Sequence, residues 1–426
     1  MSRRSRSILR KTLGVVAAAA VLGPLMPAAA GGAPMAAPVA FPGAEGFGAQ
    51  VTGGRGGEVY HVTHLNDSGP GSFRDAVSQP NRIVVFDVGG YIALRSPVHV
   101  SSNITIAGQS APGDGVATRG YQVSFSNSDN VIVRYMRFRH GLTPDQNRDA
   151  VAIDSGSNMI FDHVSTSWGR DETFSINSST NITVQYSIMA EGLDPHSCGG
   201  LVQSDGVTLS HNLYIHNKTR NPKSKGRLQY VNSVIYNWGT DGYILGDSAG
   251  ISNANAVGNY FVAGPSTTGD PFTRANANYH IYASGNYYDE DADGQLDGRA
   301  TTDADLGPAT IEDQPFDFPP VTVQTARQAY DTVLAGAGAS LHRDAIDTRL
   351  VNDVARQTGA IITDPAQVGG FGVLRGGTPP ADTDRDGIPD TWEHERGLDP
   401  GDASDAGDTD AGGYTHVERY LNELAG

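Results

Sequence analysis

One short pattern of apolar and polar residues recurs along most of the chain. Each copy has a turn residue, three or four β-branched or aromatic residues, a polar corner and a second apolar run. The copies begin at Asn103, Asn130, Asn158, Asn181, Gly206, Gly226, Asn253 and Asn278. Recurrence every ~20–30 residues is typical of solenoids, and alternating apolar positions without a helical period indicate strands. We therefore predict an all-β fold, a right-handed parallel β-helix. The alternative, a sandwich or propeller, would need hairpin turns such as Asn-Gly, which are scarce.

An asparagine recurs near the corner between the two strands of a coil. Asparagine tolerates left-handed backbone and can form hydrogen bonds from one coil to the next. We predict a structural ladder formed by Asn212, Asn232, Asn259 and Asn286.

Two segments near the C-terminus have a helical period instead. Residues 323–334 and 343–354 place apolar side chains three and four positions apart. We expect two short helices that pack on the barrel or cap its end.

The first residues have the order of a secretory signal peptide. Five basic residues within positions 1–12 precede an apolar run from Leu13 to about Met26, and small residues follow. A membrane anchor would need a longer apolar run of ~20 residues. We predict a signal peptide at 1–30, a secreted, extracellular protein, a catalytic domain at 41–375, and a linker with a calcium-binding tail at 376–426.

Charge narrows the classes of partner. The chain has 47 acidic and 30 basic side chains and a formal net charge of −17. This balance excludes a nucleic-acid binder that works by neutralising phosphates, and an acidic substrate would need a bound cation.

No second apolar stretch is long enough for a membrane partner, and the single cysteine, Cys198, excludes an intrachain disulfide. We expect a monomer.

The tail contains a 12-residue loop with the spacing of a calcium site. Oxygen ligands fall at positions 1, 3, 5, 9 and 12, with glycine at position 6 and a backbone carbonyl at position 7. These ligands are Asp382, Asp384, Asp386, Asp390, Glu393 and the carbonyl of Ile388. The loop resembles the calcium-binding repeats at the ends of secreted bacterial enzymes. Residues 408–418 form a degenerate second copy, and residues 289–297 a third candidate that has Ala300 at its twelfth position. We expect all three to be structural rather than catalytic.

Acidic and basic residues gather in neighbouring coils. Asp149 lies in one coil, Asp171 and Glu172 lie in the next, and a basic cluster from Lys218 to Arg227 follows two coils later. Equivalent positions on adjacent coils lie ~4.8 Å apart, so the carboxylates are expected to meet around one cation. A metal beside a basic cluster suits a uronate polymer: the metal acidifies the C5 proton, a base removes it, and the O4 glycosidic bond leaves by β-elimination.

Several motifs resemble polysaccharide lyase family 1, the pectate lyases. The resemblance covers residues 41–375 and is carried by the runs that start at Phe41 and Gly53, by Asp162-His163 and Asp171-Glu172, and by Arg220-Asn-Pro-Lys223. It implies a parallel β-helix, Ca²⁺ as cofactor, and eliminative cleavage of α-1,4-polygalacturonate, an acidic plant cell-wall polysaccharide.

The resemblance also implies roles for single residues. Arg220 matches the arginine that serves as the base, although guanidinium is normally never deprotonated, and the residues alone would equally allow a charge-stabilising role. Lys225 matches a second basic catalytic position. Asp149 and Asp171 match calcium ligands. The residues alone leave Glu172 as either a third metal ligand or a solvated side chain, and we predict a ligand. Asn147 and Ser175 stand where other members often have aspartates, which predicts weaker calcium binding. The expected substrate-binding residues are Lys218, Lys223, His196 and Trp168, the last of which is either a platform for a sugar ring or part of the core.

Two other functions remain open from the residues alone. A β-helix glycoside hydrolase would use the paired carboxylates and would produce reducing ends without unsaturation. A non-catalytic carbohydrate-binding protein would bind the polymer without cleaving it.

Overall fold

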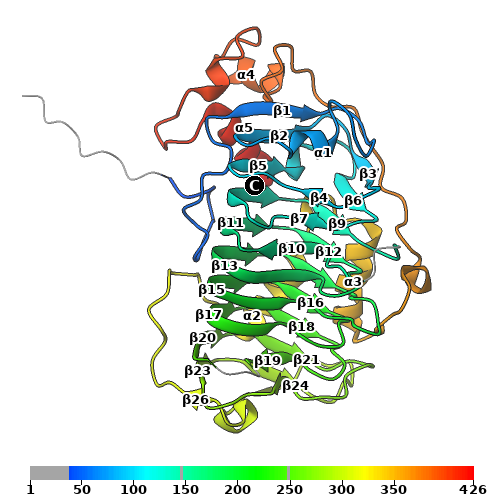
Figure 1. Ribbon diagram of the computed structural model, residues 1–426, viewed down its shortest axis with the longest axis vertical. Coiled ribbons are helices and arrows are strands. Elements are labelled where there is room, and N and C mark those ends of the chain that lie inside the picture. The colour runs from blue at the N-terminus through cyan, green and yellow to red at the C-terminus, as the bar shows by residue number, and fades with distance from the viewer. Residues whose placement is uncertain (1–37, 144–146, 247–249) are drawn as a thin grey trace, which may run out of the picture. The chain divides into compact units, whose positions relative to one another are not determined.

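Parallel strands wind into a solenoid in the computed structural model, which describes residues 38–143, 147–246 and 250–426 (Figure 1). The architecture confirms the predicted parallel β-solenoid. The predicted signal peptide, residues 1–30, lies outside the described residues.

The larger sheet has 16 strands, and its pairs are parallel. Its main path consists of β1 (Glu58–Val62), β2 (Arg82–Phe86), β5 (Ile104–Ala107), β8 (Asp129–Arg134), β11 (Ser157–Asp162), β13 (Phe174–Gln185), β15 (Leu201–Ser210), β17 (Lys223–Val231), β20 (Ser252–Val257), β23 (Tyr279–Ser284) and β26 (Thr310–Ile311). Shorter strands extend it along a second run: β4 (Val98–His99), β7 (Val123–Ser124), β10 (Val151–Asp154), β19 (Tyr243–Leu245) and β22 (Phe272–Thr273).

The second sheet has 10 strands and forms another wall of the coils. Its strands are β3 (Gly90–Ala93), β6 (Val116–Arg119), β9 (Arg137–Arg139), β12 (Ser165–Ser167), β14 (Ile188–Ala190), β16 (Leu213–Ile215), β18 (Val234–Tyr236), β21 (Tyr260–Val262), β24 (Tyr287–Asp289) and β25 (Arg299–Ala300). Only the last described pair of this sheet, β24 with β25, is antiparallel.

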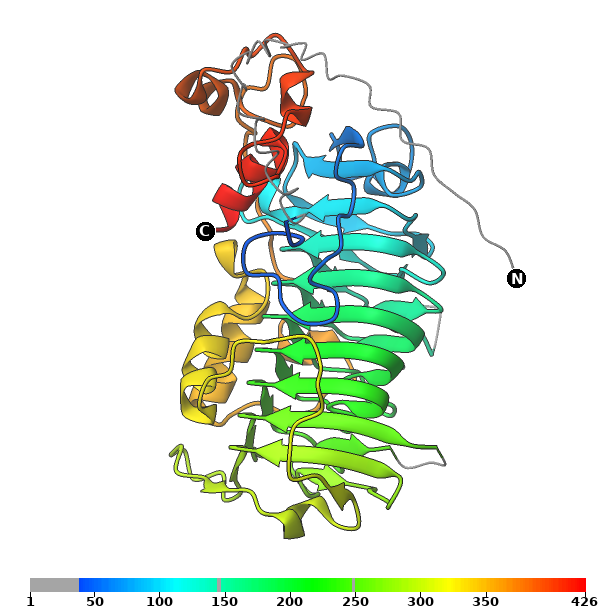
Figure 2. The same ribbon diagram turned by 90° about the vertical axis from the view of Figure 1, so that its left-hand side faces the viewer.

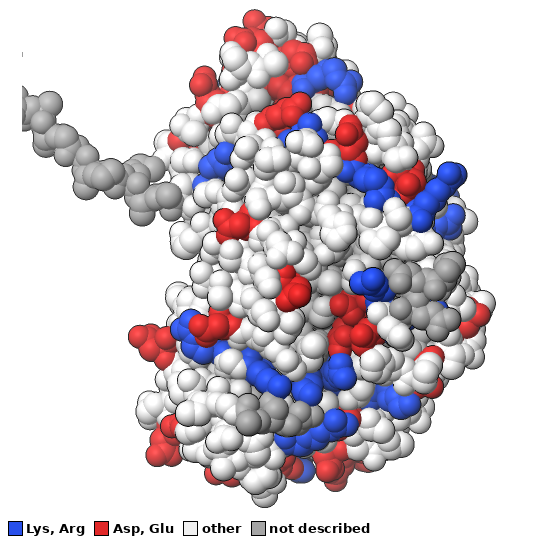
Figure 3. Space-filling model, viewed as in Figure 1, with Lys and Arg blue, Asp and Glu red and all other residues white. Residues whose placement is uncertain are grey.

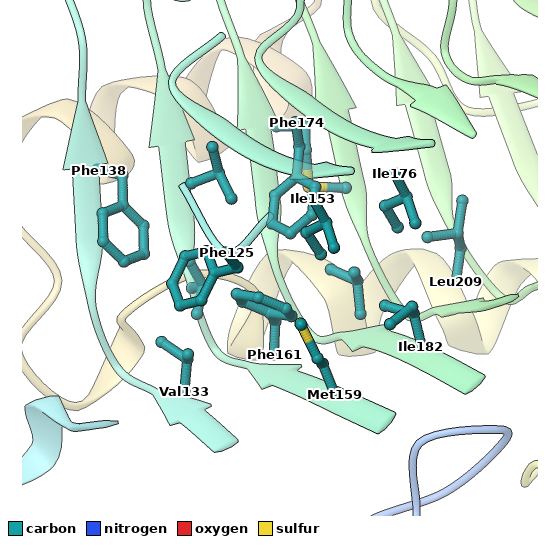
Figure 4. Packing of buried hydrophobic residues seen from close by; sticks show 14 of the residues in the cluster. Phe125, Val133, Phe138, Ile153, Met159, Phe161, Phe174, Ile176, Ile182 and Leu209 are labelled. Atoms are coloured by element: carbon teal, nitrogen blue, oxygen red, sulfur yellow. The ribbon is translucent and has the colours of Figure 1, made fainter. Parts of the chain in front are cut away.

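Apolar side chains fill the interior in rows that run from coil to coil. Phe125, Phe161 and Phe174 come from three successive coils and meet edge to face, with ring centroids 4.9 and 5.1 Å apart (Figure 4). Burial of one such ring contributes ~1.5–3 kcal/mol to stability. Because parallel pairing repeats in every coil, each inward position stacks on its equivalent, and this fixes which residues face outward.

The corner ladder is present with one different member. Asn259 and Asn286 accept from the amides of Ser233 and Asn259, and Asn212 accepts from the amide of Ser187. Asn232 has a left-handed φ of 51° and also links two coils, but it lies one position from the corner. The next residue, Ser233, takes the corner, and its hydroxyl accepts from the Asn212 amide at 3.2 Å. The Asn232 side chain donates instead to carbonyls of Gly258 and Gln324.

The two predicted helices lie on the side of the solenoid (Figure 2). A capping box of Thr325 and Gln328 starts α2 (Ala326–Gly336), and Asp344 caps α3 (Ala345–Arg356). Their apolar faces pack on the second sheet in one cluster with β14, β16, β18 and β21. They therefore cover a wall of the barrel rather than its end.

The C-terminal tail lies against the first coils. After a short N-terminal helix, α1 (Phe73–Ala76), the remaining helices are α4 (Asp390–Arg396) and α5 (His416–Ala425). Ile388, Trp392 and Val417 of the tail pack on Ile83 and Val85 of β2. Among the described residues, the helices are too short or too polar to traverse a lipid bilayer.

Candidate active site

Three carboxylates from two adjacent coils converge at the start of β10 and β13. Oxygens of Asp149, Asp171 and Glu172 lie within 4.8 Å of one another. The Asp149 carboxylate accepts from the Glu172 amide at 2.9 Å and from the Ser175 hydroxyl at 2.5 Å. Parallel pairing produces this geometry, because β13 follows β10 in the ladder and Ala152 pairs with Ser175.

Burial and mutual repulsion disfavour the ionised form of this group. Burial raises the pKa of Glu172 to about 8, and the charges of Asp149 and Asp171 add to the shift. Burial also raises the pKa of Asp149, although the Ser175 hydroxyl opposes the shift. Close carboxylates that resist ionisation would be relieved by a divalent cation, and a set of hard oxygen donors fits Ca²⁺.

Arg220 projects to the same place from a coil further along. Its guanidinium forms an ion pair with Glu172, and its side chain is 27% exposed. Isolated parallel bridges join Glu172 to Cys198 and Cys198 to Thr219, so the residue before Arg220 continues the same ladder. Arg220 has a left-handed φ of 58°, an unusual backbone for a residue with a side chain.

Buried neighbours hold Arg220 in this position. The Asn221 side chain donates to the carbonyls of Asn217 and Asp241 at 3.3 and 3.2 Å. Burial favours the neutral form of Arg220, but its ion pair with the Glu172 carboxylate opposes this effect, and the pKa of Arg220 is raised. Burial raises the pKa of the Cys198 thiol to about 12, which leaves it a protonated, inert packing residue.

The loop that follows β14 adds a histidine, and a lysine that follows β16 contacts the same loop. His196 Nδ1 lies 2.8 Å from an oxygen of Asp171, and the His196 side chain is 47% exposed. Lys218 forms an ion pair of 2.7 Å with Asp194 of the same loop. His196 therefore borders the carboxylate cluster, whereas Lys218 contacts the loop that carries His196. Both stay predicted substrate-binding residues.

The two remaining lysines face outward from β17. Leu201 pairs with Lys223 and Gln203 pairs with Lys225, so both lysines lie on the outer face of β15 and β17. Lys225 lines an open groove of about 520 Å³ together with Asn177, Gln203 and Asp205. Figure 3 shows acidic and basic side chains adjacent to one another on this side of the molecule. Asn147, which is exposed and lies two residues before Asp149, stays a predicted ligand.

Trp168 is not a sugar platform. Its side chain is fully buried, its indole N–H donates to Glu191 at 2.9 Å, and its ring packs against Phe371. Arg349 of α3 also binds Glu191. The expectation fails because Trp168 follows β12 on the wall that α2 and α3 cover.

The tail contains a second group of carboxylates. Oxygens of Asp382, Asp384 and Asp386 lie within 4.8 Å of one another, and those of Asp386, Glu393 and Asp405 form an overlapping group. Sequence reasoning missed Asp405, which lies outside the 12-residue loop. The Asp390 carboxylate belongs to neither group, because it accepts from the amide and hydroxyl of Thr383 at 2.7 and 2.8 Å.

The third candidate loop is partly assembled. Oxygens of Asp289, Asp291 and Asp297 lie within 4.8 Å of one another, and Asp289 is buried. Burial raises the pKa of Asp289 to about 6.

The arrangement around Arg220 suits charge stabilisation at an acidic substrate better than hydrolysis. A pair of hydrolytic carboxylates is ~5–5.5 Å apart in retaining enzymes and ~6.5–9.5 Å apart in inverting ones, where the wider gap holds the attacking water. Here one oxygen from each of the three carboxylates lies within 4.8 Å of those of the other two, which suits a shared cation. A cation shared by them and a neighbouring guanidinium would instead provide two positive groups for a substrate carboxylate.

Known proteins that are similar to this chain are described as pectate lyases. The chain is 54% identical over 394 residues to a protein of Aspergillus flavus described as probable pectate lyase C, which covers 91% of this chain and 94% of that protein. It is 52% identical over 394 residues to the counterpart from Emericella nidulans, with 91% and 93% covered. A pectate lyase of Nicotiana tabacum is 26% identical over 251 residues, 51% of this chain and 61% of that protein. No protein-family model matches the chain.

Solved structures show the same fold at low sequence identity. A pectate lyase from Acidovorax avenae superposes with a TM-score of 0.52 at 13% identity and covers 74% of this chain and 99% of that chain. The thermostable pectate lyase PL 47 gives a TM-score of 0.51 at 18% identity, with 70% and 97% covered.

Proposed function

Because the chain belongs to the pectate lyase family, we propose that it is a secreted, calcium-dependent lyase that cleaves polygalacturonate by β-elimination. The observation that carries the proposal is the grouping of Asp149, Asp171 and Glu172 with Arg220 on the outer face of neighbouring coils. A polyanionic polymer needs positive groups, and Arg220 offers one beside the carboxylates that would hold a cation.

The three carboxylates and Asn147 would hold Ca²⁺. When bound, the ion would neutralise the galacturonate carboxylate and make the C5 proton more acidic. Ser175 orients the Asp149 carboxylate through its hydrogen bond. Lys218, Lys223 and His196 would hold carboxylates of the polymer along the outer face, and Lys225 would stabilise the enolate-like charge together with Arg220.

Arg220 would remove the C5 proton. In the free protein its ion pair with Glu172 raises its pKa and keeps it protonated. To act as a base, Arg220 must lose its ion pair with Glu172 and contact the substrate instead, in a site that contains little water. A general base contributes ~10²–10⁴ to the rate, so Arg220→Ala should keep the fold and lose at least that factor in kcat.

The reaction has a direct test. Purified protein mixed with polygalacturonate and calcium should form unsaturated ends that absorb ultraviolet light, and a chelator should abolish the signal. New reducing ends without absorbance would indicate a hydrolase, and binding without cleavage would indicate a carbohydrate-binding protein.

A second experiment distinguishes a base from a charge stabiliser at Arg220. Added amines and guanidine should partly restore the activity of Arg220→Ala, and the rescue rate should rise with the pKa of the added base. Rescue that is independent of this pKa would assign Arg220 to charge stabilisation alone.

A further inference from the structure

Several carboxylate oxygens in the tail are buried without a donor. Both oxygens of Glu393 and of Asp384, Oδ2 of Asp386 and Oδ1 of Asp405 have no hydrogen-bond partner among the described residues. Glu393 is 0% exposed and Asp386 is 3% exposed. A buried carboxylate is costly unless it is paired or binds a metal.

Their environment opposes ionisation in the absence of a counter-charge. Burial raises the pKa of Asp386 and of Glu393 to about 7 in each case, and neighbouring carboxylates add to both shifts. The groups come from three places, the loop at 382–388, helix α4 and the short 3₁₀ turn at Asp405–Gly407.

Local hydrogen bonds shape the loop around this point. Asp382 accepts from the amides of Arg385 and Gly387 at 2.7 and 3.1 Å. Gly387 has φ +89°, and a Cβ there would lie 2.8 Å from a methyl of Val59. The loop therefore turns sharply while it touches the first strand.

We propose that one calcium ion binds Asp382, Asp384, Asp386, Glu393 and Asp405, and that this ion holds the tail on the first coils. Asp405 is the residue that closes the site, because it brings the segment after α4 to the loop. Five carboxylates supply only oxygen and reach the six to eight ligands of Ca²⁺ when some of them bind through both oxygens, whereas Zn²⁺ favours nitrogen and sulfur.

Two other residues of the loop, Arg385 and Ile388, connect the site to the solenoid. Ile388 is fully buried between the loop and α4 and packs on Ile83 and Val85. Arg385 lies 3.6 Å from Asp87 of the first coils. Loss of the ion would leave repelling carboxylates at this junction, and the loop would open.

The test compares two variants of matched charge. Asp405→Asn keeps an oxygen that can accept from the Asp399 amide, as Asp405 does now, but removes a ligand. Glu395→Gln in α4 removes the same charge from a side chain that is 74% exposed. Equilibrium dialysis measures the calcium bound per chain. Thermal unfolding is recorded with and without calcium, and mass spectrometry follows trypsin cleavage after Arg385.

We expect Asp405→Asn to bind one calcium ion fewer than Glu395→Gln. At 100-fold excess over Kd, calcium should raise Tm by about 3 °C in Glu395→Gln and by clearly less in Asp405→Asn. Chelation should speed cleavage after Arg385 at least ~10-fold in the control, and Asp405→Asn should be cut quickly with or without calcium.

Equal calcium binding and equal protection in the two variants would overturn the proposal. If Asp405→Asn does not fold, Glu393→Gln replaces it with the same expected results. No readout uses lyase activity, so the outcome is independent of the proposed reaction.

Discussion

At the scale of single residues, Ser175 is an uncharged residue at the proposed calcium site, and it therefore limits the negative charge that faces the cation. Its hydroxyl donates to Asp149 and is a neutral group beside three carboxylates. We predict that Ser175→Asp lowers the calcium concentration for half-maximal activity about tenfold, a gain of ~1.4 kcal/mol in binding. Asn177→Asp, at the next outward position of β13, is the control and should change it little. An unchanged or higher calcium requirement in Ser175→Asp would contradict the assignment.

The sequence predicts the place of a side chain well where the repeat determines it. It does so poorly where contacts between segments far apart in the chain determine it. The repeat and the motifs predicted that Asp149, Asp171 and Arg220 share one wall, because parallel coils stack equivalent positions. Trp168 was misjudged because periodicity does not show that α2 and α3 cover its wall. Asp405 was missed because no short motif links it to the loop it approaches.

At the scale of elements, a buried ionic contact attaches α3 to the second sheet. Arg139 of β9 is fully buried and lies 2.7 Å from Asp347 and 3.1 Å from Asp344. We predict that Asp347→Ala lowers the free energy of unfolding by ~3 kcal/mol, because it leaves a buried guanidinium with one partner fewer. Asp331→Ala on α2, which removes an exposed carboxylate, should cost less than ~1 kcal/mol. Urea unfolding measures both, and equal losses would contradict the role of the contact.

A second contact between coils makes stability depend on pH. Burial disfavours the charge of Asp162, but His163 and Arg134 outweigh it and hold the pKa of Asp162 well below its usual range. Gln185 also donates to Asp162 at 2.9 Å. A depressed folded-state pKa stabilises the protein above the unfolded value of ~3.9, and this stability is lost as pH falls further.

The resulting prediction concerns Asp162→Asn. Its deficit in unfolding free energy relative to the unmodified protein should not shrink between about pH 7 and pH 5 and should shrink only below about pH 4. Urea unfolding across this range provides the measurement. A deficit that shrinks already between pH 7 and pH 5 would exclude Asp162 as the titrating group.

At the scale of the described solenoid, the tail and the proposed active site lie on different coils. The tail packs on β2 and β5, whereas the carboxylate cluster and Arg220 lie at β10, β13 and β17. In solenoids each coil contacts mainly its neighbours, so a local loss of stability need not reach distant coils. The repeat alone predicts the fold class. It does not predict that the tail packs on the first coils, because the pattern of apolar residues in the tail does not indicate which part of the chain they contact.

This separation leads to a prediction for Val417→Asp, which puts a charge into the contact between α5 and the first coils. Val417 is 2% exposed and belongs to the cluster with Ile83 and Val85. We expect a lower Tm and increased binding of a hydrophobic dye, because apolar surface of β2 becomes exposed. At 25 °C, where the coils stay folded, kcat/KM on polygalacturonate should remain within about twofold. Arg419→Ala on the exposed side of α5 is the control. A large loss of kcat/KM in Val417→Asp at that temperature, with circular dichroism unchanged, would show that the tail acts on the catalytic face itself.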